Sequence, residues 1–362
     1  INLHFRDVDL AKITPEIDSL QMSGIVNGDF SLLQEDVIFK PKSNVTIDNL
    51  ELNSIPLGDL YLKIIGSDDL SIYSVDASLR REEFTAMAAV GLIEITETAS
   101  LIDIDLQIND LNLEVFSPLG GESFTDIRGL LSGRTNVVGN LVSPELYGTF
   151  NLEKTGMRIP LLNLDFVFDD ATTIEFEKYR FSIPNTQVTD TKYDTKANVS
   201  GYFEHDAFSD WRMDLDINTR RFLVLDTQQD EESLYYGTAF INGTASIAGP
   251  IDELVIDVAA TTGENTTFKI PISDTHSIGD DSFIYFLSPA EKQARVSGEE
   301  FIMEELKGLS LNFDLDITRD AEVEIVVDIK NNSTLKGRGE GTMFIEINTL
   351  GRFNMWGDFQ VY

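Results

Sequence analysis

The sequence contains no cysteine, which excludes disulfide bonds, thiol nucleophiles and thiolate metal sites. Histidine is almost as rare, since His4, His205 and His276 are the only three and they follow no metal-ligand spacing. No nucleophile elbow, P-loop or dinucleotide fingerprint is present. We therefore predict a protein that is not an enzyme, binds no metal and requires no cofactor.

Positive charge is also scarce. Lys and Arg total 27 against 62 Asp and Glu, which gives a net charge of −35. Nucleic acid binding needs clustered cations, and no such cluster is present, so nucleic acid is excluded as a partner. The same acidity would repel an anionic membrane surface, and we interpret it mainly as a source of solubility.

Long apolar runs are missing. No run approaches 18 residues and no signal segment opens the chain, so we predict that these residues do not cross a membrane. The sequence begins within a strand-like alternation at Ile1, Leu3 and Phe5, and it ends at Tyr362 within another strand-like alternation. We therefore read the sequence as a fragment of a longer protein whose anchors lie outside it.

What the sequence has in abundance is strand signals. In the stretch GLSLNFDLDIT, 308 to 318, odd positions from Leu309 to Ile317 are apolar and even positions from Ser310 to Asp316 are polar. Alternation of this kind places one apolar and one acidic face on a strand. Residues 102–108, 213–217 and 323–329 alternate in the same way, with Val326 as the break in the last run. Short helices are predicted only near Thr14 to Ile17, 288–291 and, more weakly, 299–306.

An internal repeat is a second feature. An aliphatic residue stands 18 positions before a glycine four times, and Ile-Pro-Leu or Ile-Pro-Ile follows three of these glycines by 27 or 28 residues. The markers are Gly28, Gly133, Gly243, Gly341, Pro56, Pro160 and Pro271. They predict repeat units of about 100 to 110 residues at 1–105, 106–215 and 216–315, with a truncated fourth at 316–362, all in one continuous body.

Alternating acids such as Asp103 with Asp105, or Asp314 with Asp316, raise the question of calcium. Carboxylates at positions i and i+2 lie about 6.6 to 7 Å apart on a strand, too far to chelate one ion without oxygens from loops. We therefore interpret these residues as a solvated face.

The apolar faces must contact something, because five apolar side chains per strand are worth roughly 10 kcal/mol when buried. A second sheet, as in a sandwich, is the plainest answer, although sandwich domains are usually separated by linkers that this sequence lacks. A transmembrane barrel predicts hairpins about every 20 residues, which are not apparent. The third possibility is a guest molecule, which the residues alone leave open.

The segments LKGRGEGTMFIEINTLGRFNMWGDFQVY (335–362) and GLSLNFDLDITRDAEVEIVVD (308–328) resemble the C-terminal region of the TamB family, in the form found in Bacteroidota. RDVDLAKITPEIDSLQMSGIVNGDFSL near the start and RMDLDINTRRFLVLDT at 212–227 are similar to the same family. The resemblance spans essentially the whole chain.

The resemblance implies an all-β fold, in which an elongated, curved sheet folds into a U-shaped trough with an apolar lumen. TamB proteins are AsmA-like, bridge-type lipid-transfer proteins that are anchored in the inner membrane and span the periplasm. The implied partners are phospholipid acyl chains and an Omp85-family outer-membrane barrel, TamA or TamL. The implied function is movement of phospholipid between the two membranes, with no catalytic residues.

On this basis we predict residues that line a lipid groove. They are Leu309, Leu311, Phe313, Leu315, Ile317, Val323, Ile325, Val327, Ile329, Met343, Ile345, Ile347, Phe353, Met355 and Phe359. Trp356 has the opposite parity and is expected outside the groove or at its rim. Two alternatives remain open: a chaperone-like scaffold that assembles outer-membrane proteins by β-augmentation, and an extracellular stalk with a filled core.

Overall fold

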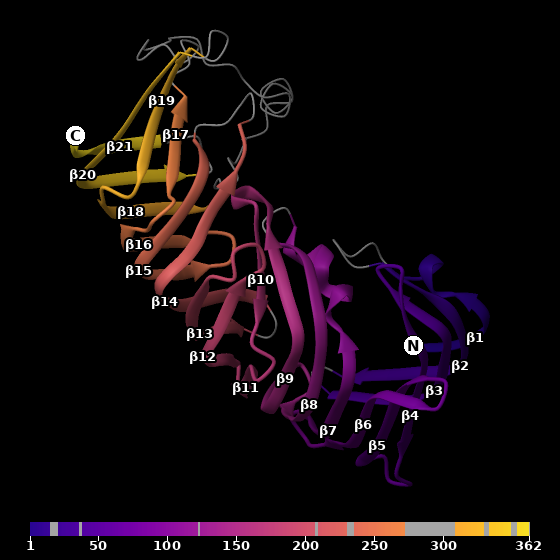
Figure 1. Ribbon diagram of the computed structural model, residues 1–362. Coiled ribbons are helices and arrows are strands. Elements are labelled where there is room, and N and C mark those ends of the chain that lie inside the picture. The colour runs from indigo at the N-terminus through magenta and orange to yellow at the C-terminus, as the bar shows by residue number, and fades with distance from the viewer. Residues whose placement is uncertain are drawn as a thin grey trace, which may run out of the picture. The chain divides into compact units, whose positions relative to one another are not determined.

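The computed structural model describes residues 1–14, 21–35, 38–121, 124–206, 209–229, 235–271, 308–328, 333–348 and 353–361. These residues form 21 β-strands and three short 3-10 helices (Figure 1). The prediction of an all-β fold is confirmed. The helices predicted at 288–291 and 299–306 fall outside the described residues, as does the helix predicted near Thr14 to Ile17 except for Thr14 itself.

The chain divides into two compact units, Ile1–Leu223 and Val224–Tyr362. The division into repeats of about 100 to 110 residues stays a prediction.

The first unit is built from consecutive antiparallel strands and contains all three helices. Its elements are β1 (Asn2–Asp9), η1 (Leu10–Lys12), β2 (Met22–Glu35), β3 (Ile38–Leu52), β4 (Ile55–Gly66), β5 (Ile72–Arg81), β6 (Phe84–Ile95), β7 (Ser100–Asn112), η2 (Leu113–Gly120), β8 (Thr125–Asn140), β9 (Ser143–Ile159), η3 (Pro160–Leu162), β10 (Leu164–Phe168), β11 (Thr173–Lys178), β12 (Arg180–Asp190), β13 (Lys196–Asp206) and β14 (Ser209–Thr227), whose last residues belong to the second unit.

Bulges bend several strands of the first unit. Asp7 in β1 and Asp110 in β7 have φ angles of 50° and 48°, and each sits at a register shift against the next strand. The freed backbone N–H of Asp7 donates to Asn27 Oδ1 over 2.8 Å, and that of Asp110 donates to Ser132 Oγ over 2.8 Å. A side chain on the neighbouring strand therefore satisfies the polar group that the bulge exposes.

The two bulges are followed by matching helix starts. Asp9 accepts from the backbone N–H of Ala11, and Asn112 accepts from that of Glu114, so both helices have an Asx cap. Leu10 and Val115, the aliphatic residues that mark the repeat in the sequence, are both buried.

The repeat glycines lie inside strands, where neighbouring backbones come close. Gly28 is in β2 with a φ of +114°, and a Cβ there would stand 2.0 Å from the carbonyl oxygen of Asn44. At Gly341, in β20 of the second unit, a Cβ would stand 1.9 Å from the carbonyl oxygen of Asp358. These positions require glycine because a side chain would collide with the next strand.

The sheet of the first unit curls until β3 approaches β7. The hydroxyl of Ser100 accepts from the backbone N–H of Phe39 over 2.8 Å and donates to its carbonyl over 3.0 Å. Near the other end of β3, Asn53 Nδ2 donates to the carbonyl of Val115 over 2.7 Å. Because three strands separate β3 from β7, these contacts require strong curvature.

A corner connects β10 to β11 through residues 169–172. The unbroken strands β9 and β12 flank the corner, and each pairs with β10 through one half and with β11 through the other. The backbone N–H of Leu152 in β9 donates to the carbonyl of Thr172 over 2.9 Å, which fastens the corner to its neighbour. The hydroxyl of Thr172 is bonded to that of Thr186 in β12.

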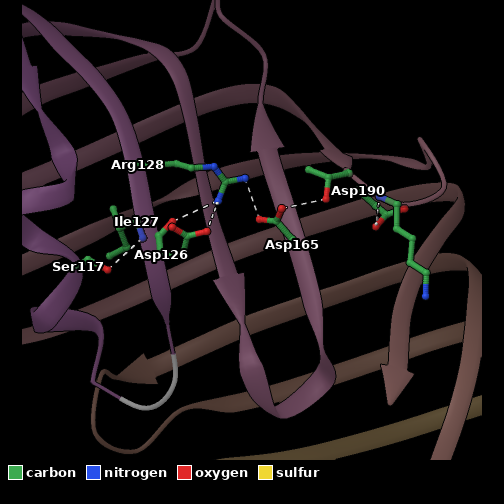
Figure 2. Close-up of polar contacts among 8 residues, drawn as sticks. Ser117, Asp126, Ile127, Arg128, Asp165 and Asp190 are labelled. Carbon is green, nitrogen blue, oxygen red and sulfur yellow. Dashed lines mark hydrogen bonds and ion pairs between the residues drawn. The ribbon is translucent and has the colours of Figure 1, made fainter. Parts of the chain in front are cut away.

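A polar clasp ties strands together near the start of β10, at the end away from the corner (Figure 2). Arg128 in β8 donates through Nη2 to Asp165 Oδ1 in β10 over 2.8 Å, and Thr191 Oγ1 donates to Asp165 Oδ2 over 2.9 Å. The guanidinium passes over Gly156 of β9, where a Cβ would lie only 2.8 Å from it. The clasp therefore depends on the absence of a side chain at position 156.

The second unit has two broken strands side by side. Its strands are β15 (Tyr236–Pro250), β16 (Val255–Thr262), β17 (Thr267–Pro271), β18 (Ser310–Ile317), β19 (Glu322–Asp328), β20 (Ser333–Asn348) and β21 (Phe353–Val361). β16 runs parallel to β18, and β17 runs parallel to β19. Corners at 263–266 and 318–321 join β16 to β17 and β18 to β19, and in Figure 1 β17 and β19 stand steeply across the direction of β16 and β18.

The long strands β15 and β20 flank both pairs, so each contributes to both sides of the bend. Phe240 of β15, which lies beside the corner at 263–266, is 1% exposed. Its backbone N–H donates to Thr266 Oγ1 over 3.1 Å, and Thr266 Oγ1 donates to its carbonyl over 3.2 Å. The sheet of each unit thus bends in the manner that the predicted trough requires.

Candidate functional site: the apolar face of the sheet

The two faces of β18 differ as its sequence predicts. Leu311 and Ile317 are 5% and 7% exposed and Phe313 and Leu315 are half-buried, whereas Asn312, Asp314 and Asp316 on the other face are exposed. β18 therefore presents an apolar side and an acidic side.

Strand register extends the apolar side of β18 across the second unit. Phe313 is the partner of Val258 in β16 and of Ile345 in β20, and Ile345 is in turn the partner of Met355 in β21. The rows on either side continue in the same way, with Leu311 beside Ile347 and Leu315 beside Met343. Side chains that are cross-strand partners share a face. The predicted groove residues of β18, β20 and β21 therefore belong to one face.

This face carries no charged residue among the described positions of its strands. Its residues are Ile241, Gly243, Ala245, Ile247, Ile256, Val258, Ala260, Thr262, Leu311, Phe313, Leu315, Ile317, Gly341, Met343, Ile345, Ile347, Phe353, Met355, Gly357 and Phe359. The side chains of this face become less buried toward β21. Ile345 in β20 is 4% exposed, whereas its partner Met355 in β21 is 41% exposed.

The remaining predicted residues fall in several places. Val323 and Ile325 of β19 are the partners of Gly337 and Leu335, which have the same parity along β20 as Met343 and Ile345. Val327 lies in a bulge and is 49% exposed, while its neighbour Val326 is buried. Leu309 precedes β18 and is half-buried, and Phe359 of β21 is half-buried opposite Gly341. Ile329 lies outside the described residues, as does the side chain of Phe353.

Charge on β19 lies on the side opposite Val323 and Ile325. Glu324 is buried and accepts from Lys269 Nζ of β17 over 2.9 Å. The hydrogen bond from Lys269 lowers the pKa of the Glu324 carboxyl, and the same bond raises the pKa of the Lys269 ammonium. Lys336 of β20 pairs with Glu322 over 2.6 Å on the same side.

The first unit has a longer apolar row that sequence reasoning missed. Starting at β1, the cross-strand partners are Phe5, Gly28, Val45, Leu62, Ala77, Ala89, Leu106, Thr135, Gly148, Phe176, Phe181, Phe203 and Met213. No charged residue interrupts this row, which we call the apolar row. Each strand looks unremarkable alone, and only the register aligns these positions.

The adjacent row lies one residue away along every strand and faces the other side. Its members are His4, Asp29, Asn44, Lys63, Asp76, Val90, Asp105, Asn136, Tyr147, Glu177, Arg180, Glu204 and Arg212. Most carry charge. Along these two rows, which include every strand of the first unit except β10, the sheet therefore separates an uncharged side from a mostly charged one.

Side chains on the apolar face are packed along part of its length. Ile64, Tyr73, Val75 and Ile93 form a buried cluster over β4 to β6. By contrast, a shallow hollow of about 450 Å³ over the same strands is lined by Lys63, Asp76, Val90 and others of the charged face. We place no site in that hollow, because its walls include both charges and exposed aliphatic side chains.

Aromatic side chains gather on the apolar face between β9 and β14. Phe176 lies 5.0 Å from Phe150 and 4.5 Å from Phe181, measured between ring centroids. His205 joins this group at 4.7 Å from Trp211, and burial lowers the pKa of its imidazole. Phe150 and His205 are buried and Phe176 and Phe181 are half-buried, so the group belongs to the packed part of this face.

The predicted groove residues fall within the part of the chain that matches a known family. Residues 185–362 match the family model of the TamB C-terminal domain. No curated protein and no solved structure matches the chain. Among the described residues, no helix has the length and apolar character needed to cross a membrane.

The TamB family is a non-enzymatic component of the translocation and assembly module, spans the periplasm and works with an Omp85-family barrel, TamA. The match, the all-β architecture and the alternating strands of β18 to β21 agree, and the chain belongs to the TamB family.

Proposed function

We propose that the apolar face binds phospholipid acyl chains and guides them between the inner and outer membranes. The observation that carries this proposal is the pair of rows in the first unit. Each strand from β1 to β9 and from β11 to β14 contributes an uncharged residue to one side and its neighbour in sequence to the charged side. A path for an acyl chain needs a face that stays uncharged from strand to strand; a filled core needs one too, and the lipid content of solvent extracts separates these two possibilities.

The energies suit a transport path. Burial of one acyl chain of about 16 carbons is worth roughly 13 kcal/mol at about 0.8 kcal/mol per CH₂, so escape of a lipid into water is very slow. A face that stays apolar from strand to strand lowers that cost at each step, while the charged face keeps the protein in solution.

Phe313 provides the test. It is half-buried in the middle of the row formed by Ala245, Val258, Ile345 and Met355. We expect Phe313→Arg to remove most phospholipid that copurifies with the chain, measured by mass spectrometry of solvent extracts. Asn312→Arg is the matched control, because it places the same cation one residue away on the acidic face.

Circular dichroism separates loss of lipid from loss of fold. Phe313→Ala, which removes the ring without adding charge, should retain the β spectrum and an intermediate lipid load. If folded Phe313→Arg protein holds as much phospholipid as Asn312→Arg protein, the proposed lipid path is wrong.

The alternative is a scaffold for the assembly of outer-membrane proteins. In the described part of the chain β21 pairs along one side only, with β20, so its other side is able to accept a strand. The same solvent extracts decide between the two functions. Bound peptide in place of phospholipid favours the scaffold, and it should then be unaffected by Phe313→Arg.

A further inference from the structure

A stacked aromatic pair, one ring exposed and the other half-buried, lies on the acidic face of the second unit. Phe344 of β20 and Trp356 of β21 are cross-strand partners, and their rings stack with centroids 5.8 Å apart and an interplanar angle of 15°. Trp356 is 49% exposed, and it lies on the side opposite Met355, as its parity predicts. Because Phe344 and Trp356 lie on the side opposite Ile345 and Met355, the pair is not part of the apolar face.

Carboxylates surround this pair. The acidic face of the paired segments of β16, β18, β20 and β21 carries Asp257, Asp314, Asp316, Glu340, Glu346 and Asp358, and the described positions of these segments include no Lys or Arg on that face. Arg338, the next residue on that side of β20, pairs with Glu322. Asp314 is the cross-strand partner of Phe344, about 5 Å away. Asp358 lies two residues beyond Trp356 on the same side, about 7 Å away.

The described contacts of these acids leave the pair accessible. Asn354 donates to Glu346 through a neutral amide and Thr342 donates to Asp316 through a neutral hydroxyl, so neither of these bonds brings a positive charge to the face. Arg319, in the corner at 318–321, is engaged by Glu340 through bonds of 2.9 and 3.0 Å. The aromatic surface therefore stands in a field of negative charge.

We propose that this face binds a positively charged segment of a protein partner, with an arginine side chain lying on the Phe344 and Trp356 rings. A planar guanidinium stacks on an indole and can at the same time donate to a nearby carboxylate such as Asp314 or Asp358. A lipid headgroup fits less well, because the phosphate beside its ammonium group would be repelled by the same acids. The site is on the opposite side of the sheet from the proposed lipid path and does not depend on it.

The probe is a fluorescein-labelled peptide of alternating arginine and threonine, titrated with the purified chain and followed by fluorescence anisotropy. We expect saturable binding that weakens about tenfold in Trp356→Ala and survives largely in Trp356→Phe. A peptide with citrulline in place of arginine keeps the shape without the charge, and it should bind at least tenfold more weakly.

A control is needed because any cationic peptide is attracted to a chain of net charge −35. Asp103→Asn removes one charge from an exposed strand position of the first unit, whereas Asp358→Asn removes one beside the aromatic pair. Asp358→Asn should weaken binding severalfold and Asp103→Asn should change it little. Equal effects of the two, binding unaffected by Trp356→Ala, no binding, or capture of phosphatidylethanolamine vesicles in place of the peptide would each overturn the proposal.

Discussion

The sheets of the two units bend at corners that are built differently. In the first unit, one broken strand, β10 to β11, turns between two unbroken strands, and all pairings are antiparallel. In the second unit, two broken strands turn side by side, and each half is parallel to its neighbour. Parallel pairing needs a long connection, which the chain supplies between Pro271 and Ser310. The bend therefore does not depend on strand direction.

What the corners share is a buried small residue at their end. Thr172, Thr266 and Ala321 are all buried, and the next residue begins a strand in each case. They differ in how that residue is fastened. Thr266 bonds to the backbone of Phe240, whereas the hydroxyl of Thr172 bonds to another side chain.

The largest expected effect is at the residues that the corners pack against. Phe240 is 1% exposed and Leu152 is 5% exposed, each on the long strand beside its corner. We expect Phe240→Ala to lower the free energy of unfolding by about 4 kcal/mol and Leu152→Ala by about 3 kcal/mol, since the larger side chain leaves the larger cavity. Urea denaturation measures both, and Val255→Ala on the exposed face is the control. A greater loss of unfolding free energy in Leu152→Ala than in Phe240→Ala would contradict this prediction.

A smaller effect is expected at the corner threonines. Thr266→Val keeps the shape but leaves the buried N–H of Phe240 without its hydroxyl acceptor, which costs about 1 to 3 kcal/mol. Thr172→Val removes a bond between two hydroxyls, so the loss should be about 1 kcal/mol, and the double variant Thr172→Val with Thr186→Val should cost little more. Urea denaturation measures these losses. Equal losses of unfolding free energy in Thr266→Val and Thr172→Val would contradict the predicted difference between the two corners.

The smallest effect is expected at the ion pair between Lys269 of β17 and Glu324 of β19 in the second unit. The pKa of Glu324 is lowered from its usual 4.5, so its carboxylate stabilises the folded state above pH 4.5 and this contribution is lost as pH falls through the lowered value. Glu324→Gln should cost roughly 1 kcal/mol at pH 7 and less at pH 3. Thermal unfolding across this range tests the sign, and a cost that grows on acidification would contradict it.

The sequence predicted the faces of the strands well and the corners poorly. The alternation from Leu311 to Ile317 was sufficient to assign each side of β18, and the break at Val326 coincides with the bulge that turns Val327 outward. Periodicity reports local geometry, and a pleated strand has only two sides.

The corners and the curl depend on contacts between distant residues. Nothing near Ser100 indicates that its hydroxyl bonds to the backbone of Phe39, and nothing near Phe240 indicates Thr266 as its partner. The apolar row of the first unit was missed for the same reason, because strand register determines it. The exposed Trp356 could be assigned a side by parity, but its stacking on Phe344 required the pairing of β20 with β21.

The bulges at Asp7 and Asp110, whose backbone N–H groups donate to a side chain on the next strand, have a consequence for the exchange of chain segments during evolution. Each bulge and the side chain that satisfies it lie on adjacent strands, Asn27 for the first and Ser132 for the second. A genetic crossover between the two places would carry each bulge together with a suitable acceptor. Exchange of a whole segment between two such places would therefore leave each bulge amide with an acceptor.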